Sequence, residues 1–321
     1  MTTLEITARG YMGEQDLPTI VELLSRCAQA SPFGEGTTAD ELRMEFSLPR
    51  FDPVRHLRLW EDADSQLIGF GQLWIHEDAV EPDSFLWYRV RPDLCDGDLD
   101  ELIIAWGEEQ TRTIVQERGV QLRLRTTTIT TELERIAVLE HNGFGIDRYF
   151  QRMVCPLGAL IIEPQLPAGF TLATGPHDRD TWAGLFNESF IDHWNHLPLS
   201  GAEVAHRKSI PAHRPDLDLV AYAPDGTPAA FCLGMFDSVE NARSGRNEGT
   251  IALLGTRRGF RKRGLGRALL LSNMLALKAA GADAAALGVD TDSPTGATRL
   301  YESIGFRTVL TRILYGRSVE R

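Results

Sequence analysis

Residues 250–270 read TIALLGTRRGFRKRGLGRALL, and this stretch decides the fold class of the chain. Its first part, Thr250–Thr256, is a short β-rich run. Apolar residues at helical spacing then fill Ala268–Ala280, and Gly281 ends that pattern. A strand that leads through a loop into a helix is a building unit of α/β domains, so the stretch predicts an α/β fold.

The loop between this strand and this helix is basic and contains paired glycines. Six basic residues and no acidic ones stand between Arg257 and Arg267. The first-turn N–H groups of a helix lack partners within the helix, and the helix dipole favours an anion there. Gly264 and Gly266 would let a phosphate approach the backbone closely. A solvated basic loop is the alternative, but paired glycines before an amphipathic helix favour a phosphate site.

Two other phosphate-binding loops do not fit this stretch. A dinucleotide fingerprint, G-x-G-x-x-G, read from Gly264 would need a third glycine where the chain has Leu269. A Walker-type loop would need Gly-Lys-Ser/Thr, which does not follow. The site therefore calls for a different anionic ligand.

Composition narrows the class of protein further. A chain of 321 residues favours two domains, and its net charge of −12 argues against a nucleic-acid partner. The cysteines are too far apart for a zinc motif or a disulfide framework: Cys27, Cys95, Cys155 and Cys232. The N-terminus carries no basic-then-apolar leader, and no uncharged run of 18 apolar residues occurs. We therefore expect a cytoplasmic protein without a membrane segment.

The charge is divided unevenly along the chain. Residues 1–155 hold 28 acidic and 15 basic residues, or −13, whereas residues 156–321 hold 17 and 18, or +1. Between Cys155 and Phe170 the chain reads CPLGALIIEPQLPAGF, which is punctuated by proline and glycine like a linker. We expect one domain in each of these two parts.

The two parts also repeat one order of elements. Each opens with a strand and an acid-capped helix, continues with a hairpin-like pair of apolar runs, and then has a long helix, over Asp98–Arg118 and Leu265–Ala280. A strand, a short helix, a Gly-Phe pair and a last strand follow in both. The strand end before the long helix lies 53 residues before Gly143 in one part and 49 residues before Gly305 in the other. We interpret this as an internal duplication of one α/β unit.

The arrangement R-x-x-G-x-G over Arg261–Gly266 resembles the acyl-CoA pyrophosphate loop of the GNAT N-acetyltransferase superfamily. The stretch LGVDTDSPTGATRLYESIGF, residues 287–306, resembles the last signature of that family, a short helix with a tyrosine four residues before Gly-Phe. With the duplication, the chain is similar to tandem GNAT proteins. The resemblance implies two mixed sheets flanked by helices and acetyl-CoA as cosubstrate, with no metal.

The resemblance also implies which residues contact the cosubstrate. A splayed strand would pair its backbone with the pantetheine arm, and the loop and helix start would hold the pyrophosphate. Gly255 suits a close approach of a ligand, although a simple bulge explains it equally well. Ser293 stands where the family often has asparagine, and with Pro294 it also forms a good helix start. The cofactor-binding candidates are Leu254, Gly255, Thr256, Arg261, Lys262, Arg263, Gly264, Leu265, Gly266, Arg267 and Ser293.

Acetyl transfer to an amine needs a neutral amine, a polarised carbonyl and a proton for the departing thiolate. Tyr301 is the candidate acid, because its register with Gly305-Phe306 favours function over a core position. Glu248 is the candidate base, since strand alternation puts it on the same face as Leu254, but a solvated loop carboxylate fits it equally well. Asp290 and Asp292 are weaker alternatives for the base.

The cluster Asp192-His193-Trp194-Asn195-His196 allows several interpretations. It corresponds to the variable substrate-side segment of the family, so we expect His193 and Trp194 to bind the acceptor. A structural cluster at a helix end fits comparably well. A zinc site would need a fourth ligand that no nearby residue supplies.

The first part looks like a decayed copy. Aligning Val90 with Thr256 puts Asp98 and Asp100 in place of the two loop glycines, and Leu139 in place of the tyrosine. Acidic side chains there would repel a pyrophosphate. We therefore expect residues 1–155 to be structural or to help enclose the acceptor.

Together these features predict an acetyl-CoA-dependent N-acetyltransferase with one active site, in residues 156–321. The acceptor is expected to be a small-molecule amine that the sequence does not identify, and the oligomeric state stays open. Alternatives are transfer of a longer acyl group, a non-amine acceptor, an aminoacyl transferase, and a non-catalytic acyl-CoA-binding regulator.

Overall fold

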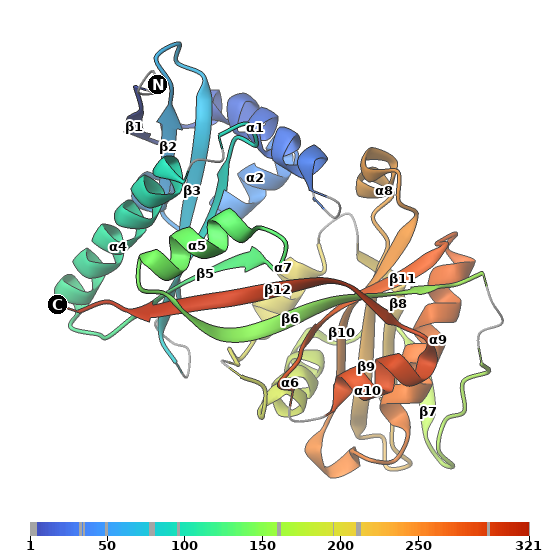
Figure 1. Ribbon diagram of the computed structural model, residues 1–321. Coiled ribbons are helices and arrows are strands. Elements are labelled where there is room, and N and C mark those ends of the chain that lie inside the picture. The colour runs from blue at the N-terminus through green and yellow to red at the C-terminus, as the bar shows by residue number, and fades with distance from the viewer. Residues whose placement is uncertain are drawn as a thin grey trace. The chain divides into compact units, whose positions relative to one another are not determined.

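The computed structural model describes residues 5–320 except 32–33, 35, 49–50, 77–80, 95–96, 159–161, 195, 210–212 and 294–295. It divides the chain into two compact units. Unit 1 comprises residues 1–148 and 312–321, and unit 2 comprises residues 149–311. Figure 1 labels the elements of both. No helix in the described part of the chain is long and apolar enough to cross a membrane.

Unit 1 is built on six strands in the order β1-β2-β3-β4-β5-β12. β1 to β4 are antiparallel neighbours, β4 and β5 are parallel, and β12 is antiparallel to β5. The strands are β1 (Thr7–Gly10), β2 (Leu57–Glu61), β3 (Leu67–His76), β4 (Asp83–Val90), β5 (Arg123–Ile129) and β12 (Arg307–Ser318). The helices are η1 (Glu14–Asp16), α1 (Leu17–Ala30), α2 (Ala39–Phe46), α3 (Pro53–His56), α4 (Asp98–Arg118) and α5 (Leu133–His141).

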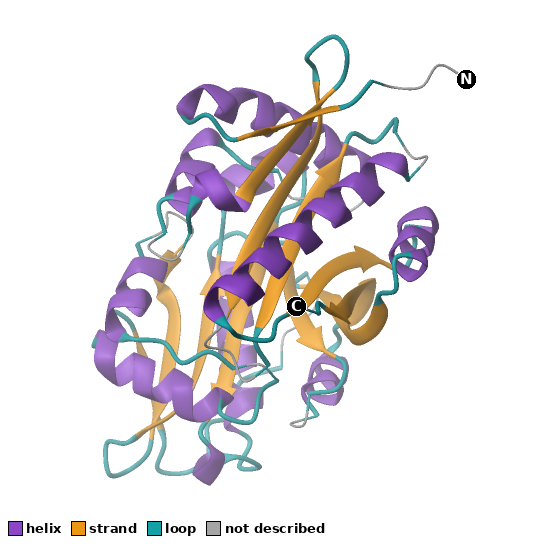
Figure 2. Cartoon of the chain, turned by 90° about the vertical axis from the view of Figure 1, so that its left-hand side faces the viewer, coloured by secondary structure: helices purple, strands orange, loops and turns teal. Residues whose placement is uncertain are grey.

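Unit 2 repeats this plan with the order β7-β8-β9-β10-β11-β6. Its strands are β6 (Gly145–Pro156), β7 (Thr171–Thr174), β8 (His213–Tyr222), β9 (Pro228–Met235), β10 (Glu248–Thr256) and β11 (Ala284–Asp290). Its helices are α6 (Arg179–Phe190), α7 (Gly201–Arg207), α8 (Ser238–Ser244), η2 (Arg258–Phe260), α9 (Leu265–Ala279) and α10 (Ala297–Ile304). β10 and β11 are its parallel pair. The common order and pairing pattern confirm the tandem α/β architecture expected from the sequence. Figure 2 shows the strands and helices of the chain by colour.

Each unit takes its last strand from the other part of the sequence. Phe150–Pro156 of β6 pairs with β11 in unit 2. Arg312–Ser318 of β12 pairs with β5 in unit 1. The structural division therefore falls at Arg148 and Thr311 instead of at Cys155, because the strand that ends the first repeat completes the second sheet.

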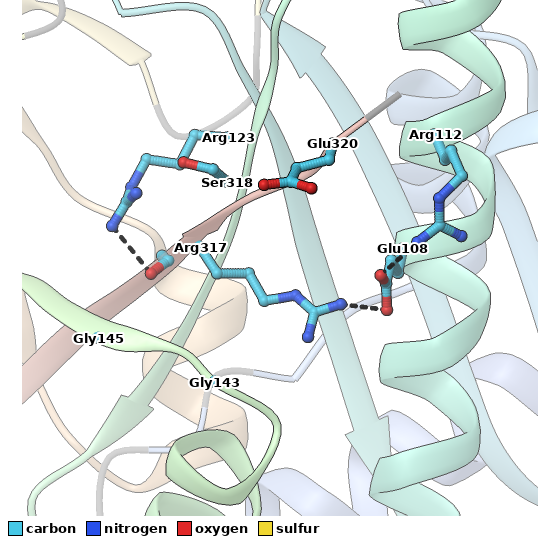
Figure 3. Close-up of a pocket in the computed structure, with 9 residues that line it drawn as sticks. Glu108, Arg112, Arg123, Gly143, Gly145, Arg317, Ser318 and Glu320 are labelled. Atoms are coloured by element: carbon cyan, nitrogen blue, oxygen red, sulfur yellow. Dashed lines mark hydrogen bonds and ion pairs between the residues drawn. The ribbon is translucent and has the colours of Figure 1, made fainter.

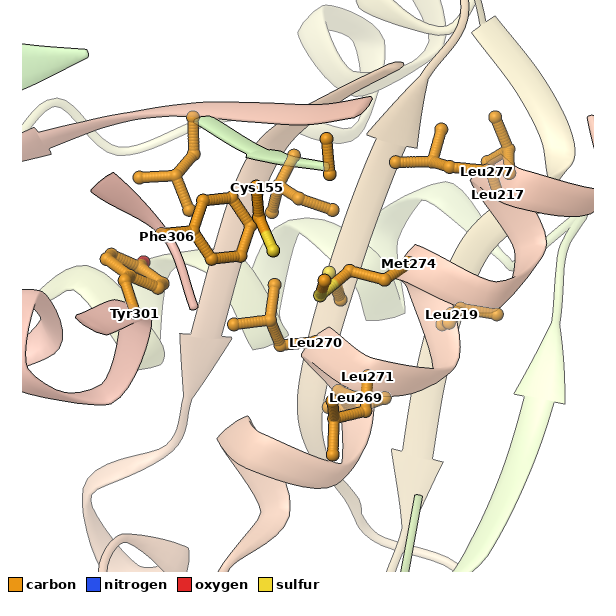
Figure 4. Close-up of a cluster of buried hydrophobic side chains, with 14 of the residues drawn as sticks. Cys155, Leu217, Leu219, Leu269, Leu270, Leu271, Met274, Leu277, Tyr301 and Phe306 are labelled. Atoms are coloured by element: carbon orange, nitrogen blue, oxygen red, sulfur yellow. The ribbon is translucent and has the colours of Figure 1, made fainter. Parts of the chain in front are cut away.

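Helices cover both faces of the unit 2 sheet. Neighbouring residues of β9 show this, since Phe231 packs with α6 and Cys232 packs with α9. The α9 side is the larger core and contains Leu269, Leu270 and Met274 (Figure 4). These two apolar layers fix the ends of α6 and α9 close to the end of β10, where the candidate site lies.

Candidate functional site

The parallel strands β10 and β11 separate halfway along their length. They pair from Glu248 with Ala284 to Ile251 with Leu287. Beyond that point β10 stays paired with β9, through Thr256 with Ala230, while β11 stays paired with β6. Over residues 252–256 β10 therefore has no strand partner on the β11 side among the residues that the structure describes. This is the splayed strand that the family resemblance implied.

A bulge between Ile251 and Leu253 changes which side chains share a face of β10. Ile251 and Leu254 both pack into the α9 core, although strict alternation would separate them. Leu253 packs on the α6 side. The expectation that Glu248 and Leu254 share one face is therefore wrong, since the extra residue reverses the alternation.

The N-terminus of α9 points its free backbone groups outward beside this part of β10. Gly264 caps the helix in the left-handed conformation, with φ of 90°, and no side chain caps the first turn. A Cβ on Gly264 would meet nothing within 4 Å, and one on Gly266 would make only ordinary contacts with Leu300 and Thr256. Protein packing therefore does not require glycine at 266, and a ligand that approaches the backbone would.

Gly255 has a different explanation. A Cβ there would lie 2.4 Å from the Phe231 ring and 2.9 Å from the Ser189 Cβ. Packing of α6 on the sheet therefore excludes any larger residue at this position. The bulge that the sequence left as an alternative lies earlier in the strand, before Leu253.

The basic run divides into two groups. Arg261 donates from Nε to the Thr256 carbonyl (3.2 Å), from Nη1 to Asp192 (2.6 Å) and from Nη2 to the Ser189 carbonyl (3.0 Å). Arg258 also pairs with Asp192, and Arg257 lies 3.1 Å from Glu188. These three arginines are thus directed to the C-terminal end of α6.

The other three basic residues lie on the helix-start side of the loop. Lys262 and Arg263 are exposed, and Lys262 has a positive φ of 62°. Arg263 donates to the Gly259 carbonyl over 3.1 Å, and Arg267 donates to the Ser303 hydroxyl over 2.9 Å. These weak surface contacts leave the three cations able to face an anion at the start of α9.

Tyr301 is buried on α10, with 7% of its surface exposed, and its ring lies 5.9 Å from that of Phe306 (Figure 4). Burial, together with the nearby Cys232 thiol, raises the pKa of Tyr301 above the usual value of a phenol. Cys232 is the cross-strand partner of Leu254, so Tyr301 lies beside the splayed part of β10. The phenol therefore stays protonated at neutral pH, in the core against which Leu254 of β10 packs.

Glu248 lies in the paired part of β10, before the bulge. Its carboxylate accepts a hydrogen bond from Arg152 of β6, and the Arg246 guanidinium lies 3.8 Å away. The backbone of Glu248 is held by the side chain of Asn241. Glu248 is therefore a fixed, mostly buried carboxylate between two cations, and not a loop residue in water.

Ser293 does not cap α10, which corrects the sequence interpretation. The helix begins at Ala297 and its cap is Gly296, in the left-handed conformation. The N–H of Ser293 donates to the Asp290 carbonyl in the turn that follows β11. Pro294 lies outside the described residues. Asp290, named as an alternative base, is buried at the end of β11, and Asp292 is exposed.

The segment after α6 holds His193 and Trp194, both partly buried. His193 Nδ1 lies 3.2 Å from the Trp194 carbonyl, and its ring packs on Phe190. Burial, and then the neighbouring His193, lowers the pKa of His196. Across the described ranges, no three His, Cys, Asp or Glu side chains are grouped to hold a metal ion.

β4 and β5 of unit 1 separate in the same way, but arginine side chains bind the backbone of the separated strand. β4 pairs with β5 only over Asp83–Phe85. The Arg135 guanidinium lies 3.8 Å from the centre of the Tyr88 ring, and both Arg89 and Arg135 donate to the Tyr88 carbonyl. Burial, and then Arg135, lowers the pKa of Arg89 to about 10. In the strand alignment this carbonyl corresponds to that of Leu254.

The helix start of unit 1 corrects the sequence alignment by one residue. Gly97, with φ of 85°, caps α4 as Gly264 caps α9, so one loop glycine is retained. Asp98, Asp100 and Glu101 occupy the first turn of α4. A cavity of about 500 Å³ beside this turn is lined by acidic residues as well as Arg135. A second cavity of about 560 Å³ in unit 1 lies beside the middle of α4, around Glu108 and Arg317 (Figure 3).

Sequence reasoning missed the carboxylates that hold the basic run. Asp192 is 66 residues from Arg258 and 69 residues from Arg261. Nothing in the local sequence pairs these residues, since their contact depends on how α6 packs beside β10. The sequence drew attention to the cluster at 192–196 because of its histidines and tryptophan, and gave no sign that Asp192 binds the arginines of the loop.

Comparisons with known proteins agree with this geometry. Residues 180–306 match the model of the acetyltransferase (GNAT) family. A mycothiol acetyltransferase of Thermobispora bispora is 31% identical over 179 residues, which are 54% of this chain and 60% of that protein. One of Streptomyces avermitilis is 25% identical over 311 residues, which are 92% of this chain and 90% of that protein. The first of these matches thus spans less than two thirds of the relative.

Solved structures share the fold over the whole chain. A GCN5-related N-acetyltransferase from Sphaerobacter thermophilus superposes with a TM-score of 0.77, at 21% identity, over 98% of this chain and 96% of that one. A tandem GNAT protein from the clavulanic acid biosynthesis pathway superposes with a TM-score of 0.72, at 14% identity, over 99% of both chains.

Proposed function

We propose that the chain is an acetyl-CoA-dependent N-acetyltransferase of the GNAT family. The match of residues 180–306 to that family's model, the mycothiol acetyltransferase relatives and the tandem GNAT fold support this proposal. In this proposal an amine attacks directly while both substrates are bound. The curated relatives are named for mycothiol, a small molecule, which supports a small-molecule acceptor. The catalytic site lies in unit 2.

One observation carries the proposal: the open edge of β10 leads directly to the uncapped N-terminus of α9. The edge over residues 252–256 has no strand neighbour on the β11 side. The free N–H groups at the start of α9, behind Gly264, suit a pyrophosphate. Lys262, Arg263 and Arg267 add positive charge there. A long ligand with an amide-rich arm and a pyrophosphate fits this combination.

The residues present fit acetyl-CoA, but with fewer charged contacts than the motif alone indicated. We assign the pantetheine arm to the backbone of Leu254–Thr256 and the pyrophosphate to Lys262–Arg267. The Arg261 guanidinium already donates hydrogen bonds to Thr256, Asp192 and Ser189. It would therefore fix the conformation of the loop without binding phosphate. Ser293 would act only through its position in the turn after β11. Bound acetyl-CoA would supply the thioester carbon for the amine to attack.

The reaction needs a C–N bond to form, a C–S bond to break and one proton to move to sulfur. Tyr301 suits the last step because burial keeps its phenol protonated in the core against which Leu254 packs. The N–H groups of β10 on the β11 side would polarise the carbonyl. Glu248 would take a proton from the amine, through water, since the bulge separates its face from that of Leu254.

We assign no second acetyl-CoA site to unit 1. The first turn of α4 is acidic, and the Tyr88 carbonyl already accepts hydrogen bonds from Arg89 and Arg135. The counterpart of Tyr301 is Leu139, fully buried in the unit 1 core. We therefore assign unit 1 a structural role.

The test is acetyl-CoA turnover against a panel of small amines, with detection of free thiol. We expect thiol release that depends on the amine and on unit 2. Acetyl-CoA binding without turnover of any amine would favour the alternative, an acyl-CoA-binding regulator. Faster turnover of longer acyl-CoA would change the assigned donor but not the site.

A further inference from the structure

The loop before α9 is tied to α6 by an arrangement that phosphate binding does not explain. The C-terminal end of α6 and the residues just after it receive three arginines of the loop, through Glu188, the Ser189 carbonyl and Asp192. Ser189 is one of the last residues of α6, whose final carbonyls have no helical partner, so Arg261 caps the helix. The start of the loop is therefore fastened to α6.

Asp192 is the centre of this attachment. Its Oδ2 accepts from Arg261 Nη1 over 2.6 Å and from Arg258 Nε over 3.2 Å, and its Oδ1 accepts from Arg258 Nη2. These hydrogen bonds hold the pKa of Asp192 below its usual range. The Asp192 side chain is 28% exposed to solvent, and both of its carboxylate oxygens accept hydrogen bonds from arginines. It thereby neutralises two cations that would otherwise add to the field at the phosphate site.

Asp192 also stands immediately before the candidate acceptor residues. His193 and Trp194 follow it directly, and the His193 N–H donates to the Phe190 carbonyl at the end of α6. The only side-chain ion pairs of Asp192 among the described residues are those with Arg258 and Arg261. Of the three attachments of the loop to α6 and the residues after it, the one at Asp192 is adjacent in sequence to His193 and Trp194. The Asp192 carboxylate is therefore the most direct route by which movement of the loop would reach these two residues.

We propose that Asp192 is a positioning residue that couples the acyl-CoA loop to the acceptor-side segment. Through Arg258 and Arg261 it holds the loop, the end of β10 and His193–Trp194 in one arrangement. Ordering of the loop by acetyl-CoA therefore orders the acceptor segment. This inference rests on the proposed function, because it needs acetyl-CoA to bind at the start of α9.

The substitution Asp192→Asn separates coupling from binding. It removes the charge that holds Arg258 and Arg261, and Arg258 is 65% exposed and so able to turn towards an anionic ligand. Acetyl-CoA affinity should be kept or rise, with a steeper salt dependence, because one more cation is available. Turnover should fall by roughly 10- to 100-fold, the range that small misplacement of reacting groups produces. Asp192→Glu should restore part of this loss.

Hydrogen exchange on the full chain, with and without acetyl-CoA, gives the direct measurement. In the wild type, acetyl-CoA should slow exchange over both residues 258–266 and residues 192–194. In Asp192→Asn it should slow exchange over 258–266 only. Protection of both segments in the variant would overturn the proposal, and so would loss of acetyl-CoA binding by a folded variant.

Two further variants complete the test. Asp216→Asn removes a carboxylate from an exposed ion pair with Arg214 in the same unit and should behave like the wild type. If Asp192→Asn fails to fold, Arg258→Gln removes one partner of the same carboxylate and should also uncouple the segments. Failure of the wild type to bind acetyl-CoA would instead refute the proposed function and is seen without any variant.

Discussion

At the scale of the residue, the assignment of acid catalysis depends on where one phenol lies. Tyr301 is buried in the α9 core, yet Cys232, the neighbour that helps raise its pKa, pairs with Leu254 on the open part of β10. A tyrosine that only filled the core would not need this position. The hydroxyl makes no hydrogen bond to any residue that the structure describes, so it is available to a ligand.

Tyr301→Phe should therefore lower turnover while leaving packing intact, because the ring is kept and only the proton donor is removed. Acid catalysis is worth about 100- to 10,000-fold, so single-turnover rates should fall by an amount in that range. Acetyl-CoA affinity and thermal stability should stay close to wild type. Tyr222→Phe, in the same unit, serves as the matched control. An unchanged single-turnover rate would exclude Tyr301 as the acid.

The pH dependence follows from the direction of the same shift. Since the pKa of Tyr301 lies above that of an ordinary phenol, the protonated form persists as pH rises through neutrality and beyond. The rate of the chemical step should therefore show no decline on the alkaline side until well above the range where a free phenol would ionise. A decline below pH 9 that disappears in Tyr301→Phe would contradict this.

Two arginines of the loop should respond differently to the same substitution. Arg261→Gln removes three contacts, with Thr256 of β10, Ser189 of α6 and Asp192, so it should lower the melting temperature of the protein. Arg263→Gln should leave stability unchanged and weaken acetyl-CoA binding by up to about fivefold, equivalent to about 1 kcal/mol for an exposed charge. Thermal denaturation and calorimetry measure the two effects. Equal losses of affinity without loss of stability would return Arg261 to the phosphate site.

At the scale of the element, α9 and α4 begin in the same way, and our proposal places a ligand site at α9 alone. Both begin after a left-handed glycine, Gly264 or Gly97, and neither first turn is capped by a side chain. The first turn of α4 carries three carboxylates, which stabilise the helix N-terminus directly. The first turn of α9 has none and would be stabilised by the anion it binds.

Gly264→Asp should prevent anion binding at the first turn of α9, since it adds both a side chain and a negative charge at a left-handed position. We expect acetyl-CoA affinity to fall by roughly 100-fold, equivalent to about 2.7 kcal/mol. Asp98→Ala, at the start of α4, should leave affinity unchanged. Higher salt should weaken binding in the wild type. Similar losses in both variants would refute the assignment of the site to unit 2.

Elements with strong local patterns could be predicted from the sequence, and those set by packing could not. The predicted helix over 98–118 has its predicted bounds, because a long amphipathic pattern lies between Gly97 and Gly119. The Ser-Pro signal at residue 293 was misleading, since α10 begins after Gly296. The bulge in β10 has no local signal, and it alone determines that Glu248 and Leu254 face opposite sides.

At the scale of the whole molecule, the exchange of strands was beyond sequence reasoning. Arg312 pairs with Ile129, 183 residues away, and no local pattern indicates which sheet a last strand joins. The duplication was visible because apolar patterns repeat, whereas the pairing depends on contacts between distant parts of the chain. Fragments cut at Cys155 would each lose a strand, so the parts cannot be tested separately.

Deletion of residues 312–321 should unfold unit 1 and leave acetyl-CoA binding in place. The segment contributes the buried Ile313, Leu314 and Tyr315 to unit 1. Burial of three such side chains is worth about 5–9 kcal/mol, comparable to the stability of a domain. Hydrogen exchange over Arg123–Ile129 should become fast, whereas calorimetry should still detect acetyl-CoA. Deletion of residues 320–321 alone is the control, and slow exchange in β5 after the longer deletion would contradict the strand assignment.

The number of acetyl-CoA sites on the intact chain tests the central claim most directly. Titration calorimetry on the wild type should give one site per chain, because among the elements that the structure describes only α9 combines free N–H groups, basic side chains and a strand edge without a partner. The same titration of Gly264→Asp should give none at comparable concentrations. Two sites per chain, or one site that survives Gly264→Asp, would contradict the account.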